Sequence, residues 1–239
     1  MTCGMIRRRK LLGQMSGIMA ASFAMAAGGC SSSPRILRYR FVVEMETPEG
    51  LKSGMTVVEA KTVFFDSLLG DRSGATYIYG DAPLIDLGER GVVVPTLAKD
   101  PIRIKSHTPL GAFEELHKDL RDPNGDTPRS LDRLAQVQGV TEIPLEMLPM
   151  LVWFPDRNNP ESVRRLEPLN VEAQLGASYR LKRATVEVTK DVPQETIAKA
   201  LQWLAGRKSA EWIVANKEKY LKDVPIERTL AVGAFRSRG

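Results

Sequence analysis

Residues 37–47, LRYRFVVEMET, decide the fold class more firmly than any other stretch of this 239-residue chain. Apolar side chains alternate there with mostly charged ones, and the apolar set is Leu37, Tyr39, Phe41, Val43 and Met45. A period of two is that of a β-strand with one buried face and one face in solvent. The turn-forming sequence Pro-Glu-Gly follows at 48–50. We therefore expect an antiparallel sheet to begin here.

Further strands are expected from patterns of the same kind. Residues 55–65, rich in valine, predict a second strand that forms a hairpin with the first. Residues 76–87 and 92–97 predict a second pair, joined by the turn sequence GERG. Shorter patterns predict three more strands, at 150–154, 179–189 and 227–235.

Helical spacing of apolar residues predicts helices at 112–120, 130–137, 194–205 and 209–221. Thr127-Pro128, ahead of the second of these, is typical of an N-cap followed by proline at the first helical position. Together these strands and helices predict a β-rich α+β fold, an antiparallel meandering sheet with a few short helices. Because no repeat or long linker interrupts residues 35–239, we expect them to form a single globular domain.

The N-terminus has the parts of a bacterial export signal in the right order. Four basic residues at 7–10 precede an uncharged apolar stretch at 11–27, which glycine and serine dilute too much for a good permanent membrane span. The sequence Ala27-Gly28-Gly29-Cys30 resembles the lipobox of bacterial lipoproteins, in which cleavage precedes an invariant cysteine. We therefore expect a lipoprotein signal peptide at 1–29, cut between Gly29 and Cys30.

The lipobox resemblance implies that lipid on Cys30 anchors the protein to a membrane. The sulfur would carry diacylglycerol, and the new amine a further chain such as palmitate. Because each buried methylene contributes about 0.8 kcal/mol, several chains anchor stably where one is marginal. Ser31, in place of aspartate, favours a periplasm-facing site on the outer rather than the inner membrane. Residues 30–34 would be the lipidated N-terminus and a short linker, and RRKLL at 8–12 leaves twin-arginine export open as an alternative to the general route.

The basic character of the chain comes mainly from this predicted signal. The formal net charge is +5, but residues 1–29 hold four of the 34 basic residues and none of the 29 acidic ones, which leaves 30 against 29. A general nucleic-acid-binding function therefore loses its support. The part after residue 178 stays basic, which indicates a solvated face or, as a sharper alternative, contact with anionic lipid or cell-wall polymer.

The cysteine content excludes several chemistries. The chain has two cysteines, of which Cys3 falls in the predicted signal and Cys30 is the predicted lipidation site. The mature domain would then have no free thiol. We expect no disulfide, no thiolate nucleophile and no cysteine-ligated metal.

Three groups of segments resemble a family of uncharacterised envelope proteins from alphaproteobacteria. They are YRFVVEMETPEG at 39–50, PMLVWFPD at 149–156 with NPESVRRLEP at 159–168, and ATVEVT at 184–189 with LQWL at 201–204. In this order they span most of the predicted mature chain. The resemblance implies an envelope setting and a β-rich fold, and it implies no activity and no site residue.

No metal or cofactor is expected. His107 and His117 are the two histidines of the chain, and the Pro-Leu-Gly break between them rules out a helical metal-binding pair. The acidic loop at 122–126, DPNGD, matches the first ligand positions of a calcium loop but lacks the later glycine and glutamate. A second acidic loop, at 156–161, has proline at a ligand position. Both loops are better explained as turns.

No catalytic constellation stands out either. There is no Gly-x-Ser-x-Gly elbow, P-loop or Gly-x-Gly-x-x-Gly turn. Glu44 and Glu46 share a strand face, which is common for exposed strands and is not specific for a glycosidase. Arg164-Arg165 is expected in a solvated turn rather than in an anion clamp. The three tryptophans are expected as core or interface anchors rather than as a carbohydrate platform: Trp153, Trp203 and Trp212.

The favoured hypothesis is a non-catalytic envelope lipoprotein that acts as a binding or structural module close to the membrane. Its expected partner is another envelope protein or the cell-wall polymer. The alternative is a periplasmic hydrolase that acts on envelope substrates through carboxylate or serine residues not singled out by the sequence. A pocket with converging titratable groups of perturbed pKa would favour the hydrolase, and an exposed apolar patch or open sheet edge would favour the binding module.

Overall fold

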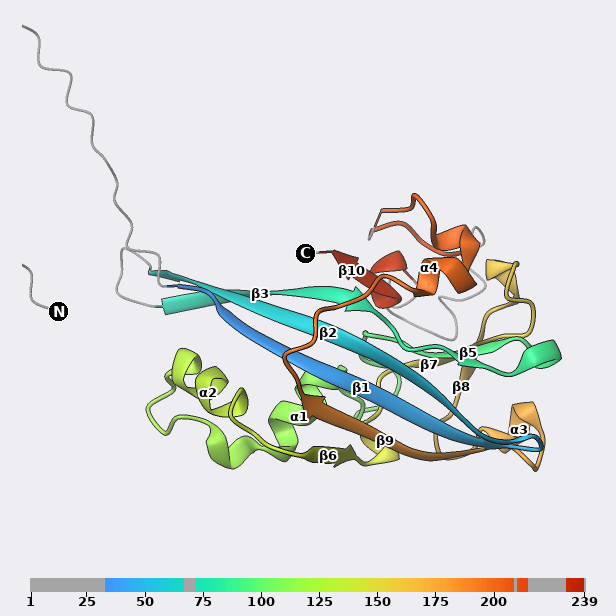
Figure 1. Ribbon diagram of the computed structural model, residues 1–239, viewed down its shortest axis with the longest axis horizontal. Helices are drawn as coiled ribbons and strands as arrows, with labels where there is room; N and C mark the ends of the chain where they lie inside the picture. The colour runs from blue at the N-terminus through green and yellow to red at the C-terminus, as the bar shows by residue number, and fades with distance from the viewer. Residues whose placement is uncertain (1–32, 67–71, 209, 215–230, 239) are drawn as a thin grey trace, which may run out of the picture. The chain divides into compact units, whose positions relative to one another are not determined.

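A computed structural model of the protein describes residues 33–66, 72–208, 210–214 and 231–238 (Figure 1). All of them belong to one compact unit, Ser31–Gly239. The predicted signal peptide, its cleavage site after Gly29 and the predicted lipidation site Cys30 lie outside the described residues. In the part of the chain that the structure describes, no helix has both the length and the apolar character needed to cross a membrane.

The first sheet has six described strands, in the order β10-β3-β2-β1-β9-β6, and each is antiparallel to its neighbours. The strands are β1 (Arg35–Thr47), β2 (Gly50–Asp66), β3 (Arg72–Asp81), β6 (Val140–Ile143), β9 (Arg180–Val188) and β10 (Arg236–Arg238). The β1–β2 ladder runs from the Thr47↔Gly50 pair at its turn to the Arg35↔Thr62 pair. The alternation in β1 favours this register, because a slip of one residue would turn its apolar set toward solvent.

A second, smaller sheet has four described strands in the order β4-β5-β7-β8. The strands are β4 (Ile85–Asp86), β5 (Val92–Pro95), β7 (Leu151–Phe154) and β8 (Arg164–Leu166). β5 and β7 are buried at nearly every residue, as expected for strands covered on both faces. Gly54 of β2 allows the chain just before β4 to come close, since a Cβ at Gly54 would lie 2.8 Å from the Leu84 carbonyl.

Four short α-helices and several 3-10 turns lie between the strands. The helices are α1 (Pro109–Leu116), α2 (Thr127–Leu134), α3 (Glu172–Leu175) and α4 (Ile197–Ala200). The 3-10 turns are Gly88–Arg90, Lys118–Leu120, Leu145–Met147, Pro160–Ser162, Gln202–Leu204 and Val232–Ala234. Contacts of α2 with β1 and of α1 with β6 place both helices against the first sheet.

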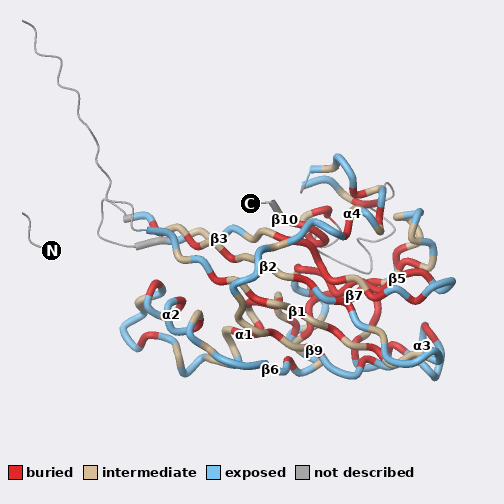
Figure 2. The backbone as a smooth tube through the Cα atoms, viewed as in Figure 1, coloured by how far each residue is buried: buried red, intermediate tan, exposed pale blue. Residues whose placement is uncertain are grey.

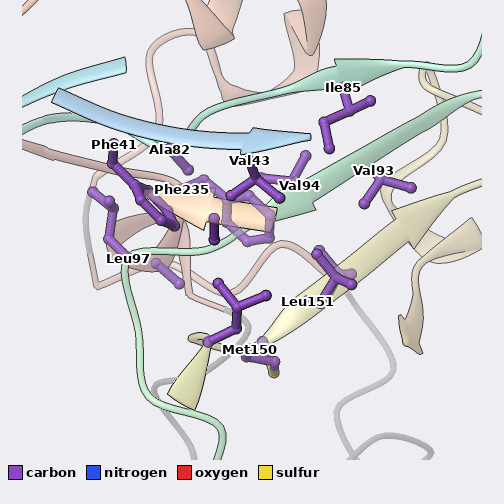
Figure 3. Close-up of a cluster of buried hydrophobic side chains, with 14 of the residues drawn as sticks. Phe41, Val43, Ala82, Ile85, Val93, Val94, Leu97, Met150, Leu151 and Phe235 are labelled. Carbon is purple, nitrogen blue, oxygen red and sulfur yellow. The ribbon is translucent and has the colours of Figure 1, made fainter. Parts of the chain in front are cut away.

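The hydrophobic core lies between the two sheets. Phe41 and Val43 of β1 point into the same cluster as Val94 of β5 and Leu151 of β7, and all four are fully buried (Figure 3). Figure 2 shows that buried residues gather where β5 and β7 approach β1 and β2. The inner face of β1, which the sequence pattern identified, therefore supplies one wall of the core.

The β-rich α+β class, with antiparallel sheets and short helices, is confirmed. The strands predicted at 37–47, 55–65, 150–154 and 179–189 are present as β1, β2, β7 and β9. β1, β2 and β3 form the expected meander, and beyond it the strands divide between two sheets. The strand predicted at 76–87 is divided into β3 and β4, and the segment between them contains Pro83, which has no amide hydrogen for a ladder.

Several local predictions were wrong. The helix predicted at 209–221 is absent over the described residues 210–214, where Trp212 instead forms an isolated bridge with Ala231. The strand predicted at 227–235 is not found in its described part, and a 3-10 turn leads there into β10. The N-cap of α2 is Asp126 rather than Thr127, because the Asp126 side chain accepts the Arg129 amide.

Candidate functional site

Helix α1 packs against the first sheet and holds a glutamate, Glu114, that lines a cavity together with residues of the sheet. The helix begins where the Thr108 hydroxyl accepts a hydrogen bond from the Gly111 amide at 3.0 Å, with proline at the first helical position. Leu110 is buried, and Glu114 lies four residues after it. Because residues four apart lie on the same face of a helix, Glu114 lies on the same side of α1 as Leu110 and is partly buried.

Strand β1 brings Tyr39 to the same region from its inner face, where the residue is 1% exposed. Burial, with a smaller contribution from Glu114, raises the pKa of the Tyr39 phenol far above its usual range. Burial also raises the pKa of Glu114, and the Arg121 guanidinium opposes that rise only in part. Both groups therefore hold their protons more firmly than they would in water.

A cavity of about 290 Å³ lies between α1 and the first sheet, and both Tyr39 and Glu114 line it. We call it the Glu114 pocket. Its other walls are apolar or hydroxyl-bearing: Thr76, Ile78, Leu97, Thr108, Pro109, Leu110 and Gly111. Within the described residues, neither the Glu114 carboxyl nor the Tyr39 hydroxyl makes a hydrogen bond. The Glu114 carboxyl, which is only partly buried, is thus free to bind a ligand, whereas Tyr39 exposes almost no surface to the pocket.

Two more cavities extend the Glu114 pocket. One, of about 280 Å³, shares Glu114 and reaches Leu131 and Leu134 of α2. The other, of about 380 Å³, shares Thr76 and lies between β2, β3 and the loop before α2. Because these cavities share wall residues with the pocket, they outline one elongated hollow, which we call the sheet–helix groove.

The sheet–helix groove has groups suited to binding but few suited to acid–base catalysis. Asp122, another carboxylate in its walls, is already engaged by the Asn124 amide at 2.9 Å and by Arg133 at 3.3 Å. The Thr62 and Thr76 hydroxyls are bonded to each other at 2.9 Å. Among the described walls, Glu114 has no second free carboxylate beside it, whereas glycoside hydrolysis normally uses two.

A buried ion-pair network fixes the loop that leads into α1. The Asp100 carboxylate accepts hydrogen bonds from Arg103 Nε at 3.0 Å and Arg165 Nε at 2.9 Å. Arg103 also donates to the Leu148 carbonyl, and so does the Ser106 hydroxyl. Burial alone would raise the pKa of Asp100, but these donors, Arg165 foremost, more than offset it and leave the pKa below its usual range. The network thus positions the start of α1 and, through it, Glu114.

A separate hollow of about 410 Å³ lies beside the β1–β2 turn, and Arg90 and Tyr179 are among its walls. Arg90 is already engaged there. Its Nη1 donates to the Leu175 carbonyl at 2.8 Å, and its guanidinium lies 5.4 Å from the centroid of the Tyr179 ring. This hollow therefore offers a ligand fewer polar groups without a partner than the sheet–helix groove does.

The predicted metal candidates do not come together. His117 packs against Phe113 with ring centroids 4.7 Å apart, and its Nε2 lies 3.0 Å from the Thr141 hydroxyl. The acids of the 122–126 loop serve turns and caps, since Asp126 accepts the Arg129 amide at 3.0 Å. Nowhere in the described part of the chain do three His, Cys, Asp or Glu side chains gather as metal ligands.

The other candidates from the sequence have structural partners. Arg164-Arg165 lies in β8 rather than in a solvated turn, with Arg165 on Asp100 and Arg164 over the Trp153 ring at 6.0 Å. Trp153 and Trp203 pack against the core and donate to backbone carbonyls at 2.7 Å and 2.9 Å. Their role as anchors is the one expected.

The carboxylates and several cations of the exposed strands pair with each other. Glu44 binds Arg183 at 2.9 Å, and Glu46 binds Arg180 at 2.7 Å. These two arginines belong to the basic part after residue 178, so part of that charge is compensated locally. Three lysines of the same basic part, Lys217, Lys219 and Lys222, lie outside the described residues.

Sequence reasoning missed Glu114 and Tyr39 as a pair. Tyr39 was recognised only as one of the buried residues of its strand. The local sequence contains no signal for Glu114, because it lies off the face that Phe113, Leu116 and Leu120 form on the predicted helix at 112–120. The pairing itself depends on how α1 packs on β1, which no local pattern contains.

Comparison of the chain with protein-family models, with curated proteins and with solved structures gave no match in any of the three. The structure therefore defines a class rather than a family. It is a β-rich α+β domain of two antiparallel sheets, with an elongated groove between the larger sheet and two helices.

Proposed function

We propose that the protein is a lipid-anchored binding module of the bacterial envelope, non-catalytic and attached to its membrane through Cys30. The order of basic, apolar and cysteine signals at the N-terminus supports the anchor. Four residues separate Cys30 from the first residue of β1, so the domain is tethered close to the bilayer. Ser31 favours the outer membrane, with the domain facing the periplasm.

The observation that supports the binding function is the carboxyl group of Glu114, which has no hydrogen-bond partner among the described residues of the Glu114 pocket. This carboxyl lies in a hollow whose other walls are apolar or hydroxyl-bearing, with the buried Tyr39 behind them. Few polar groups converging in a largely apolar hollow are typical of ligand sites. The elongated groove suits an extended ligand with hydroxyl or amide groups, either a strand of cell-wall polymer or a segment of another envelope protein.

Replacing Cys30 tests the anchor. In Cys30→Ser the protein loses its acylation and either appears in the soluble fraction or stays as the precursor, because no sulfur can accept the diacylglycerol. Fractionation and electrophoretic migration measure this. Unchanged membrane retention and migration in the variant would contradict the proposal.

Site-specific crosslinking tests the groove. A photoreactive amino acid in place of Thr76, which lines the groove, should capture its occupant in whole cells. The same amino acid in place of exposed Lys190 is the matched control. Glycan on the Thr76 adduct identifies the polymer, and a peptide identifies an envelope protein. Equal labelling at both positions would contradict a specific groove ligand.

The second candidate, an envelope hydrolase, is favoured by one observation, the raised pKa of Glu114 in a pocket. A carboxyl group whose pKa is raised by burial is better suited to act as a general acid than a carboxyl group in water. Release of soluble fragments from isolated cell walls, lost in Glu114→Gln, would establish the hydrolase and overturn the binding proposal. Retention of the wall without fragments supports the binding module.

A further inference from the structure

One end of the first sheet has an apolar outer face. Ile36 of β1 stands opposite Lys61 of β2, and Lys61 stands opposite Tyr77 of β3, in one row across the sheet. Phe65 lies on the same face of β2, four residues beyond Lys61. Ile36, Tyr77 and Phe65 are 48%, 41% and 49% exposed. Within the described residues Lys61 has no ion-pair partner.

From the row next to the Ile36–Lys61 pair onward, charges on the outer face of the sheet are paired across the strands. The pairs are Arg38 with Glu59, Arg40 with Glu187, Glu44 with Arg183, and Glu46 with Arg180. Such pairs are compatible with a face in water. Leu51 and Met55 are also exposed on this face, but they lie among these pairs, since Leu51 stands opposite Glu46 and Met55 opposite Val42. Scattered apolar residues of this kind are normal on protein surfaces.

The apolar end is also the end at which the chain arrives from Cys30. β1 begins at Arg35, which pairs with Thr62 of β2. From Cys30 to Arg35 the chain reaches at most about 17 Å, even when fully extended. The opposite end of β1, at Thr47, is about 40 Å from Arg35 at the rise of a β-strand. A lipid on Cys30 therefore brings the Ile36–Phe65–Tyr77 end to the bilayer and leaves the end with Arg180 and Arg183 away from it.

We propose that the exposed side chains of Ile36, Phe65 and Tyr77 rest in the interface of the bilayer that holds the Cys30 lipid. This inference depends on the proposed lipidation. Aromatic rings with one polar end are favoured at the interface, where Tyr77 keeps its hydroxyl hydrated. Lys61, in the middle of the patch, then meets the phosphates of anionic headgroups. The patch acts as a second contact that orients the domain, in addition to the lipid that tethers it.

The orientation has a consequence for the sheet–helix groove. Thr62 and Phe64 alternate with Lys61 and Phe65 along β2, so they lie on the inner face of the same strand end. Both line the groove cavity next to the loop before α2. With the patch on the bilayer, this part of the groove lies close to the membrane surface, and the ligand must be reachable from there.

A unique thiol makes this inference testable in the lipidated full-length product. With Cys3 removed with the signal and Cys30 acylated, Phe65→Cys supplies the sole free thiol for a nitroxide spin label. Met55→Cys is the matched control, since Met55 is 62% exposed on the same face of the same strand. The two positions lie about 33 Å apart along β2. The proteins are reconstituted in vesicles of phosphatidylethanolamine and phosphatidylglycerol, and Tyr77→Cys repeats the measurement at a second position.

The expected result is that oxygen dissolved in the lipid relaxes the labels at 65 and 77 more than an aqueous nickel chelate does. The label at 55 should show the reverse. Mass spectrometry of the same preparation establishes the state of Cys30. If Cys30 is acylated and all three labels behave as aqueous, the interfacial patch is refuted and the anchor stands. If Cys30 is not acylated, both proposals fall.

Discussion

Replacing Asp100 by asparagine should destabilise the domain far more than replacing an exposed carboxylate. Asp100 is fully buried and accepts hydrogen bonds from Arg103, Arg165 and the Ile102 amide at 2.9–3.0 Å. Removing one partner of a buried ion pair costs about 3–5 kcal/mol. Arg165 also lies 3.4 Å from Glu167, so Glu167 still balances part of the Arg165 charge in the variant. We therefore expect the free energy of unfolding to fall by about 3 kcal/mol, the low end of that range.

For a domain of this size each kcal/mol lowers the Tm by about 2–4 °C, so Asp100→Asn should lower it by roughly 6–12 °C. Urea and thermal unfolding of the unlipidated Cys30→Ser background measure both quantities. Glu44→Gln, which removes the exposed pair with Arg183, is the control and should cost about 0–1 kcal/mol. Equal, small losses in the two variants would refute the reasoning.

The same variant has a pH signature. The pKa of Asp100 is lower in the folded state than in the unfolded chain. Ionised Asp100 therefore stabilises the fold fully above the pKa of the unfolded carboxyl, about 3.9, and this stabilisation is lost as the pH falls through the folded pKa. The stability difference between the parent and Asp100→Asn should therefore narrow in acid. A difference that stayed constant from neutral to strongly acidic pH would contradict the assigned ion pair.

Two further predictions concern the groove and a tight turn. The raised folded pKa of Glu114 means that its ionised form weakens the fold above that pKa, so Glu114→Gln should be more stable at neutral pH in urea unfolding. This gain should vanish below the unfolded pKa of about 4.3. Gly91→Ala should prevent normal folding, because Gly91 has φ +82° and its Cβ would lie 1.9 Å from the Phe154 carbonyl. Gly125→Ala, with a similar φ but open space around it, should cost only about 1–2 kcal/mol, as measured by thermal unfolding.

The strands with strong alternation could be predicted, and the short ones could not. β1 could be predicted from its own sequence, because buried residues alternate with more exposed ones along most of the strand. β6, with the sequence VTEI and a single buried residue, and β8, with RRL, are too short to show a period. Both strands exist through pairing with β9 and β7, partners that the local sequence does not reveal.

The site was harder to predict because its residues are distant in sequence. Tyr39 and Glu114 come from a strand and a helix 75 residues apart, and Asp100 and Arg165 are 65 residues apart. Arg165 was assigned to a solvated turn because a pair of adjacent arginines lies more often in such a turn than in an anion clamp. Only the packing of β8 near the Asp100 loop supplies that partner.

Mass spectrometry of the N-terminal peptide from exported protein tests the central claim most directly. We predict a peptide that starts at Cys30 and carries the mass of a diacylglyceryl group on sulfur and of an acyl chain on the amine. An unmodified Cys30 with residues 1–29 still attached, in protein that has reached the periplasm, would contradict it.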